Sequence, residues 1–488
     1  MEVKNVNSSI KDINCNKDDI MEALKKLDLF NNERYTSLNE ITNGYIFSDI
    51  FGHVAKFCES EKSWFVYNGV IWMKDNLQIK KLAKIFVEVL DKYIRDNISD
   101  KKYISWVENL SKVTIRNKMI DDAKVESVIT LNDFDRNDNL FNVKNCTIDL
   151  KQGIAREHRA EDYMTKCANV EYIKGAKSKM FESFVNDIMS GNKDDVKYLQ
   201  KLFGQCLSGE NREQEAYIFY GKTTRNGKST LMKVVKEIFG TYCVTTNANT
   251  FANQYADANN ASPQLCHLNG ARIIYIPEPQ KAMKLDAAMF KNITGGDEVS
   301  ARKLYSEQSN FMINGKIIFC TNYLPNFNDK TIFESERIKI MPFNRHYSND
   351  EQDKDLFKKL VTEENKSAIL TWMLVGFDNY SNDGLKNTKS VETETSKYRN
   401  YSDPIGAFIK DMLVKDDNSN ITNATVYNAY KVWYREQDYS KDIESSHEFL
   451  NEMRDRNYVS KRGTVDGKSM YNVYIGYRIK TEVDNPPE

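Results

Sequence analysis

The chain has 488 residues, which is too long for one ordinary domain and predicts roughly two to four domains. Hydrophobic residues make up 40% of it and charged residues 28%, proportions that are ordinary for a globular protein. The net charge of −1 excludes a chain that is basic throughout, so any binding of nucleic acid must use a local basic surface.

The sequence predicts a soluble, cytoplasmic protein with no membrane partner. No apolar run approaches the length of a transmembrane helix, and Met1 is not followed by a signal-peptide pattern. The eight cysteines are scattered and include no C-x-x-C pair. This argues against a zinc site and is typical of free thiols in a reducing compartment.

The N-terminal part predicts a polar segment and then a mixed α+β domain. Residues 1–35 are polar with weak helical periodicity, and residues 36–175 mix strand and helix signals. The pair Asn68–Gly69 predicts a tight turn between two strands. Residues 82–94 predict an amphipathic helix, and residues 140–153 predict a hairpin.

The middle of the chain predicts a parallel α/β sheet. After a helical collar over 176–210, the region 211–380 contains continuous apolar runs, as in strands covered on both faces. The runs are 216–220, 273–276, 317–319 and 338–341. Polar residues follow two of them, at Glu278 and Asn322. Ligands bind at the carboxyl ends of strands in such sheets, so a site is expected there.

The stretch YIFYGKTTRNGKST, residues 217–230, predicts a phosphate-binding loop between a strand and a helix. Five residues separate its two glycines, whereas the general pattern G-x-x-x-x-G-K-[ST] has four. Lys228 is expected to reach the outer phosphates of ATP, and Ser229 to hold Mg²⁺. The alternative is a lysine-rich loop without a ligand. The candidate nucleotide-binding residues are Gly221, Asn226, Gly227, Lys228, Ser229 and Thr230.

Hydrolysis of ATP also needs a carboxylate, a polar sensor near the γ-phosphate and a cation. Glu278, Asn322 and Arg337 follow the loop in that order and are candidates for these roles. Each has an ordinary alternative: an exposed loop glutamate, a turn asparagine and a solvated arginine. Together with Lys228 they form the candidate catalytic set.

The segment NITGGDEVSARKLYSEQSNF (292–311), followed by CTNYLP and SERIKIMPF, resembles the superfamily-three helicases. More closely, the chain is similar to the phage, plasmid and poxvirus primase–helicases. The stretches WFVYNGVIWMKD, LFNVKNCTIDL, YLQKLFGQCLSG and AILTWMLVGF occur in the order that this family uses. The resemblance covers roughly residues 45 to 475.

This resemblance implies an α/β, P-loop, AAA+-like ATPase core in a hexameric ring. Glu278 then matches the Walker B acid, Asn322 matches sensor one, and Arg337 matches the arginine finger that reaches the ATP of a neighbouring subunit. The segment 294–313 matches the hairpin that such helicases push against single-stranded DNA. Arg302 and Lys303 are its basic residues here.

Two departures from the family pattern lie in the nucleotide site, and the first is the loop that is one residue longer than the general pattern. Pro277 stands where many nucleoside triphosphatases place a magnesium-binding aspartate. The chain is expected to lack a primase domain, because FDRND (134–138) predicts a solvated acidic turn and not a polymerase centre. A primase or polymerase is therefore expected to act in trans, and the chain itself is expected to make no primers.

The C-terminal region, 404–488, predicts a winged-helix-like domain beyond a linker over 381–403. Two helical stretches precede a hairpin in which Lys461, Arg462 and Lys468 concentrate positive charge. A helix with a basic wing commonly binds duplex DNA. The alternative is a basic face that is only solvated or that packs on the ring.

The sequence thus predicts an ATP-driven DNA helicase or replication initiator of a phage, plasmid or mobile island. The family resemblance implies 3′→5′ travel along one strand. One alternative is an initiator that binds an origin and uses ATP only to control assembly. Another is an unrelated P-loop enzyme such as a small-molecule kinase.

Overall fold

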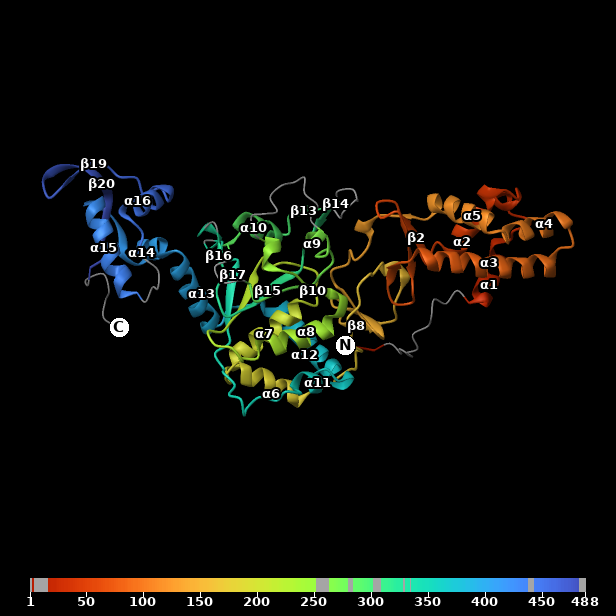
Figure 1. Cartoon of the computed structure of the whole chain (residues 1–488), viewed down its shortest axis with the longest axis horizontal. Coiled ribbons are helices and arrows are strands. Elements are labelled where there is room, and N and C mark those ends of the chain that lie inside the picture. The colour runs from red at the N-terminus through yellow and green to blue at the C-terminus, as the bar shows by residue number, and fades with distance from the viewer. Residues whose placement is uncertain are drawn as a thin grey trace.

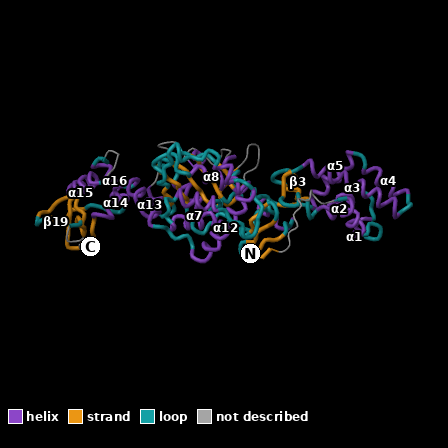
Figure 2. The backbone as a smooth tube through the Cα atoms, turned by 90° about the horizontal axis from the view of Figure 1, so that it is seen from below, coloured by secondary structure: helices purple, strands orange, loops and turns teal. Residues whose placement is uncertain are grey.

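A computed structural model describes residues 2–3, 16–251, 263–279, 284–301, 309–327, 330–333, 335–437 and 443–481. Three bodies lie in a row, with the N-terminal helices at one end and the C-terminal helices at the other (Figure 1). The view from below shows the same row, with the central sheet enclosed by helices (Figure 2).

The N-terminal body packs helices against a small sheet. Its helices are α1 (Lys17–Leu27), α2 (Glu40–Phe51), α3 (Asn76–Asn97), α4 (Lys101–Leu110) and α5 (Val113–Glu126). The sheet has the order β4-β3-β2-β5, made of Trp72–Lys74, Ser63–Tyr67, Ala55–Cys58 and Val128–Ile129. The predicted turn is confirmed, since the Asn68 side chain accepts hydrogen bonds from the N–H groups of Val70 and Ile71. Helix α1 buries Ile20 and Leu24 in this core, so the predicted polar segment contributes to the domain.

A second small sheet leads into the collar helices. Its order is β1-β8-β7-β6, made of Glu2–Val3, Ile154–Arg156, Cys146–Asp149 and Leu140–Val143. The hairpin β6–β7 confirms the prediction for 140–153. Helices α6 (Lys179–Ile188) and α7 (Lys193–Gln205) follow, as the apolar spacing predicted.

The central body is built on a parallel sheet of order β10-β11-β15-β9-β17. These strands are Cys243–Thr245, Ile273–Pro277, Lys316–Thr321, Ala216–Tyr220 and Ile338–Pro342, and every neighbouring pair is parallel. Both faces are covered, as the continuous apolar runs predicted. Tyr217 and Phe219 of β9 pack with helices α7, α8 and α12, whereas Ala216 and Ile218 pack with α10 on the other face (Figure 1).

Three helices of the central body lie between these strands along the chain, and three more follow the last strand, β17, among the described residues. They are α8 (Lys228–Phe239), α9 (Pro263–Cys266), α10 (Ala287–Gly295), α11 (Leu356–Leu360), α12 (Glu363–Asp383) and α13 (Lys389–Ser402). Strands β12 (Lys284–Leu285) and β16 (Asn326–Phe327) form a short parallel pair. Helix α13 lies within the predicted linker and buries Val391 and Tyr398, so much of that segment is ordered against the sheet.

An antiparallel hairpin separates α10 from β15. Its strands are β13 (Glu298–Ala301) and β14 (Ser309–Met312), with Glu298 opposite Met312. The two strands fall where the family resemblance places the channel hairpin. Arg302 and Lys303, the predicted DNA-contacting residues, lie outside the described residues.

The C-terminal body combines three helices with a three-stranded antiparallel sheet. The order along the chain is α14 (Pro404–Met412), β18 (Leu413–Thr422), α15 (Asn423–Glu436), α16 (Ser446–Asp455), β19 (Lys461–Val465) and β20 (Lys468–Ile479). The sheet order is β18-β20-β19. The two helices and the final hairpin follow the prediction, but β18 was not foreseen. Its sequence LVKDDNSNIT is mostly polar, and it is a strand because it pairs with β20.

Three further predictions concern membranes, thiols and metals. Across the described ranges, no helix has both the length and the hydrophobicity needed to cross a bilayer. The cysteines at 58, 146, 167, 206, 243, 266 and 320 are free. Within the same ranges, no cluster of three or more His, Cys, Asp or Glu side chains is suited to a metal ion.

Candidate nucleotide-binding site

Three candidate residues meet at the carboxyl edge of the central sheet because of its strand order. Strand β15 lies between β9, which leads into the phosphate loop, and β11, which leads to Glu278. Thr321 of β15 pairs with Tyr220, and Cys320 pairs with Pro277, so the three strands end level with one another. Asn322 is therefore placed between the loop and Glu278.

The two glycines of the loop occupy positions where a side chain would not fit. A Cβ at Gly221 would lie 2.7 Å from the Phe343 carbonyl oxygen and 2.9 Å from Lys228 Nζ. Gly227 has φ of 83° and would place a Cβ against the side chain of Ile188. Glycine adopts this left-handed conformation without steric cost. The loop thus keeps backbone close to the space where phosphates are expected.

The N-terminus of α8 is open to an anion. Gly227 caps the helix but has no side chain to accept from the first N–H groups. Ser229 is exposed and Thr230 is half-buried in the first turn. Unpaired N–H groups and the helix dipole favour negative charge at such an end. These residues fit the phosphate and magnesium roles that the sequence predicts for them.

Lys228 connects the loop to the neighbouring strand. Its side chain is buried, and Nζ donates to Asn226 Oδ1 at 2.8 Å and to Asn322 Oδ1 at 2.9 Å. Asn226 in turn donates from Nδ2 to the Thr223 carbonyl at 2.7 Å, so it holds the loop and the lysine together. Burial lowers the pKa of Lys228 to about 8, while the nearby Glu278 carboxylate acts in the opposite direction.

The additional residue of the loop is accommodated by a neighbouring segment. Arg225 takes a left-handed conformation with φ of 58°, and its carbonyl accepts from the Tyr347 N–H at 2.9 Å. A ring nitrogen of His346 lies 2.9 Å from the Thr224 carbonyl and donates to it. The segment that follows β17 thus fixes the conformation of the long loop through two hydrogen bonds.

Glu278 directly follows β11 in a strained backbone conformation. Its φ is 34°, in a region that non-glycine residues rarely adopt, and its N–H donates to the Cys320 carbonyl at 2.8 Å. Backbone strain of this kind is often found at functional sites. The side chain is exposed at the same edge as Lys228 and Asn322. Pro277 is the last residue of β11, so no aspartate precedes Glu278.

Arg337 lies at the opposite edge of the sheet. It precedes Ile338, which pairs with Ala216 at the start of β9. Six residue steps along the strand direction therefore separate Arg337 from the level of Gly221, a length of roughly 20 Å at about 3.3 Å per residue. Nη1 of Arg337 donates to the Lys291 carbonyl at 3.2 Å and to Thr294 Oγ1 at 3.1 Å. The structure brings Lys228, Glu278 and Asn322 together and does not bring Arg337 to them.

The basic residues predicted for the wing are all exposed on the hairpin β19–β20. Arg462 lies 5.1 Å from the centre of the Tyr471 ring and donates from Nε to Ser469 Oγ at 3.1 Å. Lys461 begins β19, and Lys468 begins β20. The three charges therefore share one exposed hairpin, as a phosphate-binding wing requires.

Sequence reasoning missed two buried cations at the amino edge of the sheet. Arg272, directly before β11, donates to the Asp138 and Leu140 carbonyls, both at 3.2 Å. Lys316, the first residue of β15, donates to the Ser208 carbonyl at 3.0 Å, and burial lowers its pKa to about 8. Both precede apolar runs in the sequence, and that position is the signal that could have identified them.

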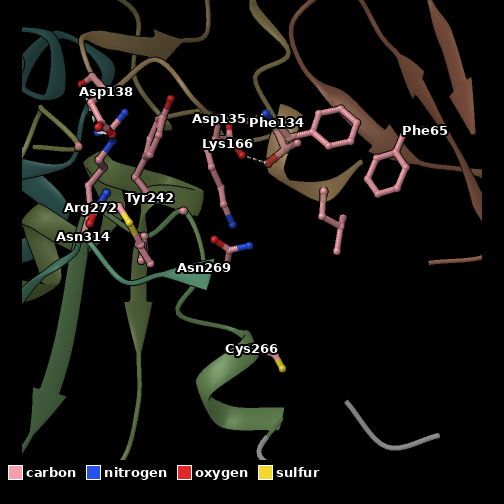
Figure 3. Close-up of a pocket in the computed structure, with 16 residues that line it drawn as sticks. Phe65, Phe134, Asp135, Asp138, Lys166, Tyr242, Cys266, Asn269, Arg272 and Asn314 are labelled. Carbon is pink, nitrogen blue, oxygen red and sulfur yellow. Dashed lines mark hydrogen bonds and ion pairs between the residues drawn. The ribbon is translucent and has the colours of Figure 1, made fainter. Parts of the chain in front are cut away.

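A cavity of about 320 Å³ lies beside Arg272, where the N-terminal body meets the sheet (Figure 3). Lys166 and Asn269 point into it, and Phe65 and Phe134 line its other side. The two phenylalanine rings pack on each other at 4.8 Å. The cavity thus lies between the N-terminal body and the amino edge of the central sheet. Lys228 lies at the opposite, carboxyl edge of that sheet.

Comparison with protein families matches three parts of the chain. Residues 44–190 match the model described as D5 N terminal like, and residues 400–485 match the one described as poxvirus D5 protein-like. Residues 219–337, which hold the candidate site, match a family of unknown function, DUF5906. The predicted resemblance to the poxvirus-type primase–helicases is confirmed, since the first two of these models are D5 models and relatives of the chain are named as helicases of large DNA viruses.

The chain has relatives in large DNA viruses. The inferred helicase L207/L206 of Acanthamoeba polyphaga mimivirus is 27% identical over 73% of this chain and 38% of its own length. The inferred helicase 022R of Frog virus 3 is 24% identical over 56% of this chain and 29% of its own length. The chain therefore spans well under half the length of these relatives. The solved NrS-1 C terminal region-CTR, in its A form apo structure, is 10% identical, covers 86% of this chain and 95% of that chain, and has a TM-score of 0.49.

Proposed function

We propose that the chain is an ATP-driven DNA helicase that opens or unwinds a viral or mobile replicon. The observation that carries this proposal is the placement of Lys228, bonded to Asn226 and Asn322, at the open N-terminus of α8 and at the same edge as Glu278. The names of its relatives support DNA as the substrate.

ATP and Mg²⁺ are the proposed cofactors, and the residues present fit them. The first turn of α8 and Lys228 would hold the phosphates, and Ser229 would ligate the metal ion. Mg²⁺ neutralises charge on the phosphates when it is bound. Asn322 would orient the outer phosphate, and Glu278 would polarise the attacking water. Replacing Glu278 with glutamine is expected to preserve nucleotide binding and to abolish hydrolysis.

A hexameric ring is part of the proposal because of the position of Arg337. It lies at the edge of the sheet opposite its own Lys228, so it can stabilise a transition state only at the site of another subunit. A cation supplied across an interface is a known way to accelerate phosphoryl transfer. The two hairpin strands β13 and β14 would then carry the DNA-contacting segment into the channel.

The second candidate function is origin binding by the C-terminal body. Helix α16 precedes an exposed hairpin with three basic residues, and the sheet order β18-β20-β19 joins helices and hairpin in one unit. In the proposed binding mode, a helix of this body would enter the major groove while the hairpin would contact phosphates. An initiator that uses ATP only for assembly would keep this binding but would not separate strands processively.

Reversing the charges of the wing tests this second function. The triple variant Lys461→Glu, Arg462→Glu, Lys468→Glu is expected to weaken duplex binding and to lower the slope of log affinity against log salt by roughly 0.9 for each phosphate that the variant no longer neutralises. Binding is measured by fluorescence anisotropy of a labelled duplex over a salt series. The matched control reverses Lys80, Lys81 and Lys84, which are exposed on α3 of the N-terminal body. Equal losses of duplex affinity in the two triple variants would show a non-specific charge effect and would contradict the proposed DNA-binding role of the hairpin.

The lowered pKa of Lys228 predicts that nucleotide affinity depends on pH. Phosphates bind the protonated form of Lys228. Above about pH 8 the lysine of the free protein has lost its proton, so nucleotide binding must then be accompanied by uptake of a proton. Affinity for a non-hydrolysable ATP analogue is expected to fall by up to about tenfold per pH unit between about pH 8 and pH 9.5. Below about pH 7 the lysine is already charged and adds no dependence. A Lys228→Met variant is expected to lack this fall, which calorimetric titration would show.

A further inference from the structure

Helix α10 ends in the TGGD segment and leads directly into the hairpin. Thr294 and Gly295 close the last turn, Gly296 follows with φ of 77°, and β13 begins at Glu298. Thr294 is 2% exposed, so it lies inside the central body and not on the hairpin strands. Only Gly296 and Asp297 connect the last turn of α10 to the first strand of the hairpin.

Arg337 holds this last turn. Besides its bonds to the Lys291 carbonyl and to Thr294 Oγ1, its guanidinium lies near Gly295, where an added Cβ would be 3.4 Å from Nη1. Thr294 Oγ1 itself donates its hydrogen to the Phe290 carbonyl at 2.8 Å and accepts from Arg337 with a lone pair. A cation at a helix C-terminus is stabilised by the helix dipole.

Arg337 differs from the other basic residues at this edge in its exposure. Arg272 and Lys316 also donate to main-chain carbonyls, but they are 4% and 1% exposed. Arg337 is half-buried and follows Glu336, an exposed residue in a left-handed conformation. The first two are enclosed, whereas the Arg337 side chain is partly exposed to solvent.

We infer that Arg337 exchanges between two partners, the C-terminus of its own α10 and the phosphates of nucleotide bound to the neighbouring subunit. Thr294 is then the positioning residue that holds Arg337 in the first state. This inference rests on the proposed ring and deepens it. A side chain that lies along the last turn of α10 cannot at the same time extend across an interface. The nucleotide bound to one subunit thereby determines whether Arg337 of the next subunit contacts the last turn of α10, which leads into the hairpin.

The direction of the exchange follows from charge. The helix end offers roughly half an elementary negative charge, whereas the phosphates of ATP offer several. Arg337 therefore leaves α10 when the neighbour holds ATP and returns when the phosphate has departed. Each cycle of hydrolysis releases and restores one contact at the base of the hairpin.

Thr294→Val tests the inference because it removes the hydroxyl while it keeps the shape of the side chain. The variant is expected to hydrolyse ATP while separating strands with at least about fivefold lower yield per ATP. The yield is measured as base pairs separated per ATP consumed, on one forked substrate. Thr294→Ala, which also lacks the hydroxyl, is measured alongside so that the result does not depend on the folding of one variant. Thr294→Ser keeps the hydroxyl and is expected to retain the wild-type yield.

Asn211→Ala is the matched control for a merely structural role. Asn211 Nδ2 donates to the Thr294 carbonyl at 2.9 Å, so this variant loosens the same helix end without removing a partner of Arg337. A loss of yield in Thr294→Val and Thr294→Ala only supports the exchange. A wild-type yield in both, or an equal loss in Asn211→Ala, would overturn it. A wild-type chain that hydrolyses ATP without separating strands would instead refute the proposed helicase, and this inference with it.

Discussion

Replacing Lys228 with alanine is expected to lower ATP hydrolysis by at least about 100-fold, with and without single-stranded DNA. The variant removes the charge that would meet the developing negative charge on the phosphates. It also removes the two hydrogen bonds that tie the loop to Asn226 and to Asn322. Hydrolysis is measured as phosphate release, and the wild type is expected to be stimulated by single strands.

Lys222→Ala is the matched control, because Lys222 is an exposed lysine of the same loop. It is expected to hydrolyse ATP within about twofold of the wild type, which would assign the loss to Lys228 and not to loop charge. An equal rate of wild-type hydrolysis with and without single-stranded DNA would favour an unrelated P-loop enzyme. Substantial hydrolysis by Lys228→Ala would contradict the proposal that Lys228 binds the phosphates of ATP. An inactive wild type would indicate that the long loop and Pro277 disable the site, or that the ring had not assembled.

Arg337→Ala is expected to lower ATP hydrolysis by about 100-fold or more, as Lys228→Ala does. Rings that contain both variants are nevertheless expected to regain hydrolysis, because each variant supplies the side chain that the other lacks. The reason is the placement of Arg337 at the far edge from its own Lys228. In co-expressed rings of both variants, about a quarter of the interfaces would join an intact Lys228 to an intact Arg337 by random mixing. Phosphate release from the mixed rings is expected to recover to a comparable fraction of the wild-type rate.

The control for complementation combines Lys228→Ala with the double variant that lacks both side chains. No interface in such rings is complete, so hydrolysis is expected to remain at the level of the single variants. Absence of recovery in the first mixture, with rings verified by size, would show that Arg337 acts only within its own subunit. Its bonds to α10 would then be its whole role.

Much of the central body could be predicted from the sequence, because local patterns carry the necessary information. Continuous apolar runs predicted β9, β11, β15 and β17 as strands covered on both faces. The glycines at 221 and 227 predicted a strand-to-helix turn, and the order of Glu278 and Asn322 after such runs predicted their place at one edge.

Other elements could not be predicted from local sequence patterns, because contacts with residues distant in the chain determine their secondary structure. Strand β18 is polar and exists because β20 pairs with it. Helix α13 lies in a segment predicted as a linker, and its order follows from Val391 and Tyr398, which pack into the central body. The structure also shows how the long phosphate loop is braced, since its carbonyl acceptors are met by donors more than 120 residues further along the chain.

By itself, the sequence determined which residue types stand at the ends of which strands, and these residue types predict an ATP site. Hydrophobic period and glycine placement are local properties, so one chain suffices to predict them. Only the tertiary structure decided that β15 lies between β9 and β11, which makes Asn322 a hydrogen-bond partner of Lys228. It also decided that Arg337 bonds to the end of α10, because strand order and helix packing are set by contacts between residues far apart in sequence.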